Sequence, residues 1–264
     1  MVLTETDWIR ADRPRRRVGR RVEVHRSIGS TNDRARALLE EPGGEGVAVV
    51  AEEQTAGRGR RGRTWQSPPG LNLTLSVALW PAVTAGAAWT LAASTGLACR
   101  TACASYAGVA LKWPNDVVSG DGAKLGGLLL ETTIDGDRVG SAVLGIGLNV
   151  NWRHADMPDE IAVGATSLAD LAGRTIDRVE LLGVLLDELD REIGALEAGT
   201  SPLERYRSVC ATLGTDVTVE TATGRVTGRA VEVDEAGALV VEGAAGRTVL
   251  SSGEIVRLRP GVPA

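Results

Sequence analysis

The first third of the chain alternates between strand-like and helix-like patterns. Residues 22–28 (VEVHRSI) and 71–80 (LNLTLSVALW) switch between apolar and polar positions, which is typical of a half-buried strand. Residues 47–53 (VAVVAEE) form a short apolar run that also predicts a strand. Between the predicted strands at 22–28 and 47–53, residues 30–41 begin with helix-capping residues and continue at helical spacing. We therefore expect a strand, a helix and two further strands in this order.

The middle of the chain contains the longest helical pattern, followed by more strands. Residues 85–106 are continuously apolar and rich in Ala and Leu, which predicts a helix packed against a sheet. Residues 117–133 predict a strand, a tight turn and a second strand, because a Gly-Asp-Gly cluster separates two apolar runs. The remaining predicted elements are strands at 109–113 and 138–151 and amphipathic helices at 178–197 and 202–211.

The pattern changes after Leu213. From there the chain alternates Thr, Val and Gly, with turn residues every eight to twelve positions. Five short strands fit this spacing, which predicts a small β-barrel of roughly fifty residues. We expect a separate C-terminal domain over residues 213–264.

The N-terminal end has the opposite character. Residues 10–21 (RADRPRRRVGRR) contain seven arginines and almost no apolar side chains. Such a segment cannot bury enough apolar surface to order itself. We therefore expect residues 1–21 to be a mobile basic tail whose removal leaves catalysis intact, and residues 22–212 to form the main domain.

The chain is nevertheless acidic as a whole. Its 264 residues carry a formal net charge of -5 at pH 7, so arginine clusters mark local positive sites and not a general polyanion-binding surface. Apolar residues make up 43% of the chain, enough for a sizeable core, and no apolar run approaches the length that crosses a bilayer. We therefore expect a cytoplasmic protein.

Cysteine and histidine limit the possible chemistry. Cys99 and Cys103 lie four positions apart in an Ala-rich helical pattern, so buried thiols are favoured over a disulfide or a metal site. His25 and His154 are the only histidines of the sequence, which leaves little from which to build a zinc site or a catalytic triad.

Residues 57–63 (GRGRRGR) are the densest charged stretch outside the tail. They match G-x-G-x-x-G, but the following RTWQSPPG has two prolines and no helical pattern, so the stretch does not open a dinucleotide-binding helix. It lies in a long loop between two predicted strands. One interpretation is a disordered surface loop, and the other is a loop that an anionic ligand folds by pairing with its guanidinium groups.

A second polar cluster lies at residues 112–117 (KWPNDV) and 124–127 (KLGG). The predicted turn between them brings Lys112 and Lys124 to one end of the sheet, with Asn115 and Asp116 between them. Two lysines, an amide and a carboxylate suit a carboxylate substrate, phosphates and Mg²⁺. Taken singly, Lys124 and Asp116 are equally consistent with solvated turn residues.

Two further motifs have a structural and a functional interpretation. Ser30, Thr31 and Asn32 form an ordinary helix N-cap sequence, or they face a small polar ligand. Residues 145–151 (GIGLNVN) are an irregular strand end, or they offer Asn149 and closely approaching backbone to a purine. Core packing is the default interpretation of Trp65 and Trp113.

Together, STN, QTAGRGRRGR-x-W-x-S-P, KWPND, KLGG-x-L-x-E and G-x-G-x-N-x-N, in this order and at these intervals, closely resemble the biotin protein ligases. The resemblance extends from about Val22 to the C-terminus. It implies an α+β fold in which a mixed β-sheet is flanked by helices, as in class II synthetases and lipoate ligases, with a small Src-homology-3-like barrel. Bifunctional members carry an N-terminal DNA-binding domain, whereas about twenty-one residues precede the first predicted strand here, so the monofunctional type is favoured.

The resemblance also implies a reaction. Biotin protein ligases join biotin to ATP as biotinyl-5′-adenylate with Mg²⁺, release pyrophosphate, and transfer biotin to one lysine of a biotin carboxyl carrier domain of acyl-CoA carboxylases. Lys124 matches the lysine that contacts the biotin carboxylate and the α-phosphate. Arg58 and Arg60 match loop arginines that enclose the adenylate. We also expect residues 57–66 to be mobile without ligand.

Matching residue by residue assigns the remaining positions. The implied biotin contacts are Ser30, Thr31, Asn32, Gln54, Gly57, Arg58, Gly59, Arg60 and Lys124. The implied ATP contacts are Arg58, Arg60, Arg61, Trp65, Lys112, Asn115, Asp116 and Asn149. Catalytic roles fall to Lys124, Arg60, Lys112 and Asp116, and Asp116 is also the candidate Mg²⁺ ligand and the candidate base of the transfer step.

Two alternatives remain open from the sequence. A lipoate-protein ligase shares the implied fold and acyl-adenylate chemistry, although the GRGRRG and KWPND pair favours biotin. A nucleic-acid-binding module would use residues 10–21 and 57–63, but the acidic total disfavours it.

Overall fold

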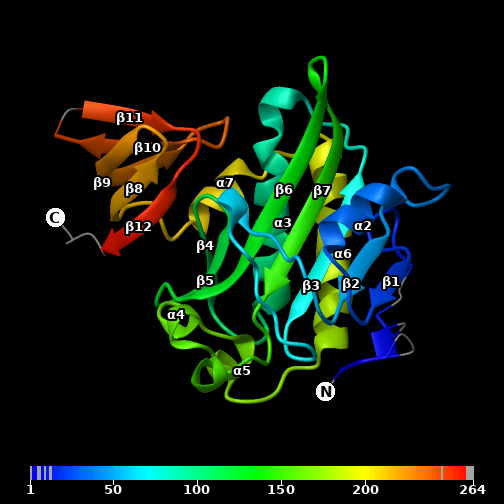
Figure 1. Cartoon of the computed structure of the whole chain (residues 1–264). Coiled ribbons are helices and arrows are strands. Elements are labelled where there is room, and N and C mark those ends of the chain that lie inside the picture. Colours follow the sequence, from blue (N-terminus) through cyan, green and yellow to red (C-terminus); the bar gives the residue numbers. More distant parts are fainter. Residues whose placement is uncertain (1, 5–6, 9, 12–13, 245, 260–264) are drawn as a thin grey trace.

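The computed structural model describes the whole chain except residues 1, 5–6, 9, 12–13, 245 and 260–264, and the side chains of 257–259. Its strands form two sheets, one of seven strands and one of five, which lie in separate parts of the molecule (Figure 1). The last five residues of the expected C-terminal domain lie outside the described residues, as do parts of the expected tail.

The larger sheet has the strand order β1-β2-β3-β7-β6-β5-β4. Its strands are β1 Val22–His25, β2 Ala48–Ala51, β3 Leu73–Leu79, β4 Val109–Lys112, β5 Asp116–Ser119, β6 Lys124–Asp135 and β7 Arg138–Leu148. The pair β1–β2 is parallel, and every other neighbouring pair is antiparallel. The expected mixed sheet is therefore confirmed.

Helices cover both faces of this sheet (Figure 1). Helices α3 (Trp89–Cys103) and α6 (Arg178–Glu197) pack on each other and on the main core, which includes Ala48 and Val50 of β2. The intervening Val49 faces the other way, into a smaller cluster with helix α2 (Thr31–Leu38). Side chains alternate between the faces of a strand, so β2 is apolar throughout because both of its faces are buried.

Residues 152–177 contain elements that the sequence pattern did not predict. They are the 3-10 helix η3 (His154–Asp156) and the helices α4 (Asp159–Ala162) and α5 (Leu168–Ala172). Helices this short show no full repeat of apolar positions, so a periodicity argument cannot detect them. Other helical elements are the 3-10 turns η1 (Arg60–Gly62) and η2 (Ala85–Ala87) and helix α7 (Leu203–Ser208).

The C-terminal part has the predicted five strands. They are β8 Asp216–Thr221, β9 Gly224–Val233, β10 Leu239–Gly243, β11 Gly246–Leu250 and β12 Glu254–Arg259, all paired antiparallel in the order β11-β10-β9-β8-β12. Indole N–H groups connect this part to the main domain. Trp89 Nε1 donates to the carbonyl of Glu235 at 2.6 Å, and Trp113 Nε1 donates to that of Gly237 at 2.9 Å.

The expectation of a mobile N-terminal tail is wrong for the residues that the structure describes. Trp8 and Val18 are fully buried and Ala11 is 1% exposed, all in the main core. Arg15 pairs with Asp187 at 2.8 Å and its side chain is 1% exposed, and Arg17 pairs with Glu197, whereas Arg16, Arg20 and Arg21 are exposed. The sequence argument failed because it counted arginine as solvated, whereas a paired guanidinium packs its apolar stem against the protein.

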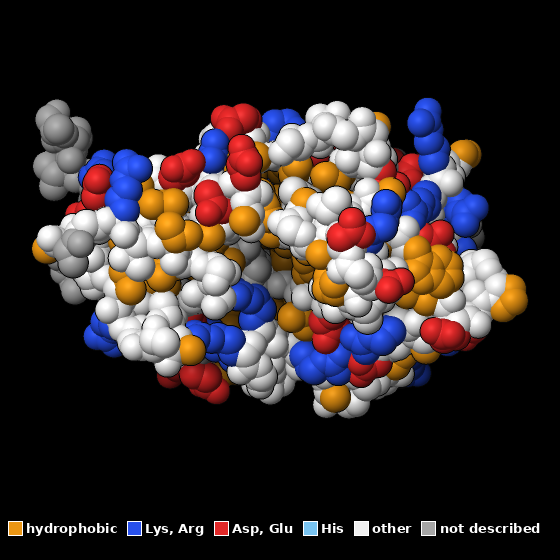
Figure 2. Space-filling view, turned by 90° about the horizontal axis from the view of Figure 1, so that it is seen from above, with side chains coloured by type: hydrophobic (Ala, Val, Ile, Leu, Met, Phe, Trp, Pro, Cys, Tyr) orange, Lys and Arg blue, Asp and Glu red, His pale blue; other side chains and the backbone are white. Residues whose placement is uncertain are grey.

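Charge is distributed evenly over the visible surface. The face seen from above carries interspersed acidic and basic side chains over both parts of the molecule (Figure 2). Within the described part of the chain, no helix combines the length and the apolar character needed to cross a membrane. All three cysteines are buried free thiols, as expected.

Candidate active site

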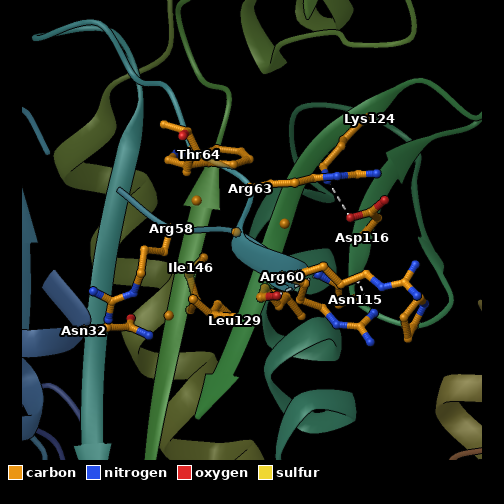
Figure 3. A pocket seen from close by; sticks show the side chains of 18 of the residues that line it. Asn32, Arg58, Arg60, Arg63, Thr64, Asn115, Asp116, Lys124, Leu129 and Ile146 are labelled. Atoms are coloured by element: carbon orange, nitrogen blue, oxygen red, sulfur yellow. Dashed lines mark hydrogen bonds and ion pairs between the residues drawn. The ribbon is translucent and has the colours of Figure 1, made fainter. Parts of the chain in front are cut away.

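Most of the predicted site residues line one pocket, between the arginine loop and strands β5–β7 (Figure 3). These are Ser30, Thr31, Asn32, Gln54, Arg58, Gly59, Arg60, Arg61, Trp65, Lys112, Asn115, Asp116 and Lys124. They come from α2, the loop after β2, the β4–β5 connection and the start of β6, so only the tertiary fold brings them together. Gly57 and Asn149 are not among the lining residues.

One end of the pocket is a wall of polar side chains that hold one another. Gln54 Oε1 accepts hydrogen bonds from the backbone N–H of Thr31 at 2.8 Å and from its hydroxyl at 3.0 Å. Ser76 Oγ lies 2.7 Å from Thr31 Oγ1 and 2.6 Å from Asn32 Oδ1. The Asn32 amide donates to Glu131 Oε2 at 2.7 Å. This network fixes the orientation of each donor and acceptor at the wall.

Ser30 decides between the two interpretations of the STN motif. It occupies the N-cap position of α2 with extended backbone, but its side chain accepts no hydrogen bond from the helix. The residue is 4% exposed and lines the pocket. Helix capping therefore does not account for its hydroxyl, and a role facing a ligand is favoured.

The loop of residues 57–66 folds over the pocket. A Cβ on Gly57 would lie 2.6 Å from the carbonyl oxygen of Trp65, so the close approach of the two backbones requires glycine. Arg61 adopts a left-handed conformation with φ 58°, and Gly62 follows with φ 74°. A left-handed arginine is uncommon, which indicates a loop held by its contacts and not by local preference.

Trp65 packs against the sheet at the glycines of two motifs. A Cβ on Gly147 would meet the indole at 2.4 Å, and one on Gly127 would meet it at 3.6 Å. These glycines therefore make room for an aromatic ring over β6 and β7. The indole Nε1 is buried and has no hydrogen-bond partner. An unpaired buried donor beside a pocket is a site for a ligand acceptor.

The arginines of the loop have different partners. Arg58 makes two hydrogen bonds of 2.7 Å to the Asp33 carboxylate of α2, and Glu131 lies 3.6 Å from it. The bidentate bond from Arg58 lowers the pKa of Asp33. At the other end of the loop, Arg63 pairs with Glu254 of the C-terminal domain, and Arg61 lies 3.9 Å from the same carboxylate. The loop is thus held at both ends by carboxylates.

Arg60 differs from these three. Its guanidinium donates to Asn115 Oδ1 at 3.2 Å and has no ion-pair partner within the described residues. Burial lowers the pKa of Arg60, while the nearby Asp116 carboxylate acts in the opposite direction. Arginine stays protonated at neutral pH in spite of such a shift. A partly buried guanidinium with an uncharged neighbour is placed to receive an anionic ligand.

The KWPNDV and KLGG motifs contribute two lysines to the pocket, Lys112 and Lys124. Lys124 Nζ lies 2.7 Å from Asp116 Oδ1 across the β5–β6 hairpin, and the two side chains point toward each other in Figure 3. The Asn115 side chain is held by two hydrogen bonds. Its Oδ1 accepts from Arg60, and its Nδ2 donates to the carbonyl of Leu128 at 2.7 Å. Lys112 also lines the pocket, and its Nζ lies 3.5 Å from the carbonyl oxygen of Ile255.

Asn149 has a structural role in this arrangement. It is 5% exposed, and its Nδ2 donates to the carbonyl of Thr166 at 3.1 Å. Its backbone N–H donates to Leu125, and its carbonyl accepts from Leu168. These bonds tie the end of β7 to β6 and α5. Contact between Asn149 and an adenine stays a prediction.

The sequence interpretation missed four residues that organise the pocket. Asp33, Ser76, Glu131 and Glu254 hold the functional side chains, but each lies within an ordinary helix or strand pattern. Only Glu131 had a signal, because it ends the quoted KLGG-x-L-x-E motif. Ser76 occupies an ordinary polar position in the alternation of β3, and its complete burial is visible only in the structure.

The arrangement suits a ligand with two different ends. Lys124 and Arg60 at one end attract a carboxylate or a phosphate, and the hydrogen-bonded wall at the other selects a small polar group. No cluster of three or more His, Cys, Asp or Glu side chains within the described residues could hold a metal ion by itself.

Known proteins agree with this geometry. Residues 24–149 match the biotin/lipoate A/B protein ligase family, and residues 212–258 match the biotin protein ligase C-terminal domain. The chain is 36% identical over 251 residues to the biotin–[acetyl-CoA-carboxylase] ligase of Mycobacterium tuberculosis, covering 91% of this chain and 90% of the relative. It is 34% identical over 229 residues to the bifunctional ligase/repressor BirA of Bacillus subtilis, covering 85% of this chain and 70% of the relative.

A solved structure gives the same result. The biotin protein ligase of Aquifex aeolicus in complex with biotin and ATP aligns with a TM-score of 0.76 and 31% identity, covering 91% of this chain and 99% of that one. The C-terminal match and the matches to these relatives are all to biotin ligases, which supports biotin over the lipoate alternative. The chain therefore belongs to the biotin protein ligase family.

Proposed function

We propose that this enzyme activates biotin with ATP to biotinyl-5′-adenylate and pyrophosphate, and then transfers biotin to a lysine of a biotin carboxyl carrier domain. The observation that supports this most directly is that one pocket contains both kinds of group. The cations Lys124 and Arg60 lie at one end, and the polar wall around Thr31 and Gln54 lies at the other. A substrate with a carboxylate at one end and a ureido ring at the other fits such a site.

The first step has an electrostatic barrier, because a carboxylate attacks the α-phosphate of a polyanion. We assign Lys124 and Arg60 to the oxygens at which the two negative groups meet, since both line the pocket and Arg60 lacks an anionic partner there. Preorganised charges in a water-poor site stabilise the transition state by a few kcal/mol each. Lys112 is a third cation at this end and is assigned to the phosphates.

The polar wall is assigned to the biotin head. Ser30, Thr31, Asn32 and Gln54 would bind the ureido group, and Ser76 would fix Thr31 and Asn32 in place. Trp65 is assigned to the adenylate, because its buried Nε1 lacks an acceptor and its ring covers the sheet. Arg58 is assigned the role of holding the loop closed, because it bonds to Asp33 of the protein itself.

Magnesium fits this site in the manner usual for nucleotides. Mg²⁺ is held in such sites by one or two carboxylates together with substrate phosphates. Asp116 is the carboxylate at this end of the pocket, and the Asn115 amide oxygen is its neighbour. Bound there, Mg²⁺ would reduce the negative charge of the phosphates.

The transfer step needs a closed site and then a deprotonated acceptor lysine. A mixed anhydride is lost to water in an open site, and the loop of residues 57–66 covers the pocket. Asp116 is the candidate base, because its carboxylate lies in the pocket beside Lys124. The proposed acceptor is a biotin carboxyl carrier domain of an acyl-CoA carboxylase.

The test is ATP-dependent pyrophosphate release with biotin, with lipoate and without an acid. We expect pyrophosphate release in the biotin arm only. An added carrier domain should then gain the mass of one biotinyl group. Release with lipoate and not with biotin would assign the chain to the lipoate ligases. Equal release in all three arms would refute acid activation.

A further inference from the structure

The N-terminal segment is bound along the whole length of helix α6. Arg15 pairs with Asp187 at 2.8 Å, and the Asp190 carboxylate accepts the backbone N–H groups of Arg16, Arg17 and Val18 at 3.0, 2.9 and 2.8 Å. Farther along, Arg17 pairs with Glu197 at the helix end. The other end of this segment reaches the first turn of α6, where Trp8 is fully buried.

Trp8 covers a buried ion pair at that end. Arg178, the first residue of α6, lies 3.0 Å from Glu52, and the two side chains are 3% and 0% exposed. Trp8 Nε1 donates to Glu52 Oε1 at 3.3 Å, and the backbone N–H of Leu3 donates to the same atom at 2.9 Å. The Arg178 guanidinium also lies 5.4 Å from the centroid of the Trp8 ring. The N-terminal segment thus supplies two of the hydrogen bonds of the buried carboxylate.

This ion pair joins several strands of the main sheet. Glu52 directly follows β2, and its backbone N–H donates to the carbonyl of His25 in β1. Arg178 Nη1 donates to the carbonyl of Asn72, the residue before β3, at 2.9 Å. Asn72 Oδ1 in turn accepts from the backbone N–H of Val150, after β7, at 3.1 Å. The cluster therefore fixes the ends of neighbouring strands relative to α6.

The same chain segment then enters the pocket. Gln54, two residues after Glu52, is the acceptor for both Thr31 groups of the polar wall, and the arginine loop begins immediately beyond it. A buried carboxylate is stable only when hydrogen bonds satisfy its lone pairs. If Trp8 is lost, water or a shift of the chain must replace its bond. A shift of Glu52 would be passed on to the Gln54 segment, because the backbone of Glu53 and Thr55 is hydrogen-bonded to Ile28, just before the polar wall.

We propose that Trp8 is a positioning residue for the biotin side of the site, acting through Glu52 on Gln54. The N-terminal segment therefore contributes to ligand binding by the catalytic domain. Trp8 itself does not line the pocket and is not a catalytic group. This inference rests on the proposed function, because its measured quantity is biotin affinity.

The experiment compares Trp8→Ala and Trp8→Phe with Val18→Ala in the full chain. Val18 is a matched control, because it is fully buried in the same segment but binds α6 through Asp190, away from Glu52. Calorimetry gives the Kd for biotin, single-turnover adenylation gives the rate at saturating biotin, and thermal unfolding gives Tm.

We expect Trp8→Ala to raise the Kd for biotin by about tenfold, the size of one lost hydrogen bond to a charged acceptor. Trp8→Phe keeps the ring over Arg178 and should fall between Trp8→Ala and wild type. Val18→Ala should lower Tm and leave the Kd unchanged. The adenylation rate at saturating biotin should be the same in all four proteins, because the reacting groups are not displaced.

A fourth variant distinguishes an effect through Glu52 from a general loss of stability. Glu52→Gln should weaken biotin binding by itself, and adding Trp8→Phe to it should cause little further loss, because both act through one atom. Unchanged Kd in Trp8→Phe, or equal increases for Trp8→Ala and Val18→Ala, would overturn the inference. Failure of the wild-type protein to bind biotin would instead refute the proposed function.

Discussion

Lys124 and Asp116 form an ion pair of 2.7 Å across the β5–β6 hairpin, at the end of the pocket that also contains Arg60. The pair keeps the lysine in the pocket and gives its charge a partner that a carboxylate or phosphate of similar geometry can replace. The two residues are eight positions apart in sequence, and the antiparallel register of the hairpin brings them together.

Lys124→Ala should bind biotin and lose most adenylation. Removing one preorganised charge costs roughly 2 to 4 kcal/mol in the barrier, or about 30- to 1000-fold in rate. Single-turnover adenylate formation at saturating biotin and ATP measures the rate, and calorimetry measures the binding. A near-normal rate would remove Lys124 from the chemical step.

Gly57→Ala should weaken the binding of biotin and of its adenylate much more than it lowers Tm. The added methyl group meets the Trp65 carbonyl at 2.6 Å, so the loop must open to accept it. Gly108→Ala is the control, because Gly108 has open space around its Cβ position. Equal changes in Kd for the two variants would show that the close approach is unimportant.

Glu254→Gln should make the adenylate escape faster, because it weakens the attachment of Arg61 and Arg63 to the C-terminal domain. Exposed ion pairs contribute up to about 1 kcal/mol, so we expect a change of about two- to fivefold. The chase rate of labelled adenylate measures it. Glu220→Gln, which breaks the exposed pair with Arg225 in the same domain, should leave this rate unchanged.

Acid should weaken the contact between Arg58 and Asp33. The bond to Arg58 holds the pKa of Asp33 below its ordinary value, so its contribution to stability is complete above the unfolded pKa of about 4 and is lost as the pH falls through the folded pKa. The Tm of wild type should exceed that of Asp33→Asn by a constant amount from pH 7 to pH 5. This difference should shrink below about pH 4; a difference that persists there would assign the effect to another group.

Hydrogen exchange of residues 57–66 tests loop closure directly. Arg58, Arg61 and Arg63 already have carboxylate partners in the protein, so ligand supplies new partners mainly to Arg60 and Trp65. We expect biotinyl-adenylate to increase the protection of these amides. Equal protection with and without it would indicate a preformed loop.

Most elements of the fold follow from local patterns in the sequence. The strands at β1, β2, β3 and β4, helices α3 and α6, and the five C-terminal strands lie where apolar periodicity predicts them. These patterns are local, because burial of one face imposes a period of two on a strand and of 3.6 on a helix. The motif residues were also identified locally, since each motif is a short run of special residue types.

The partners of the charged side chains, in contrast, depend on the tertiary fold. Four arginines in GRGRRGR are equivalent in sequence, but three of them pair with Asp33 or Glu254, whereas Arg60 is hydrogen-bonded to Asn115 and has no ion pair within the described residues. Arg15 and Arg17 likewise belong to a segment that is solvated by composition, but Asp187 and Asp190 of α6, more than 150 positions away, hold them in the fold. Long-range ion pairs leave no periodic signal, so the sequence shows where charge is concentrated but not which atoms compensate it.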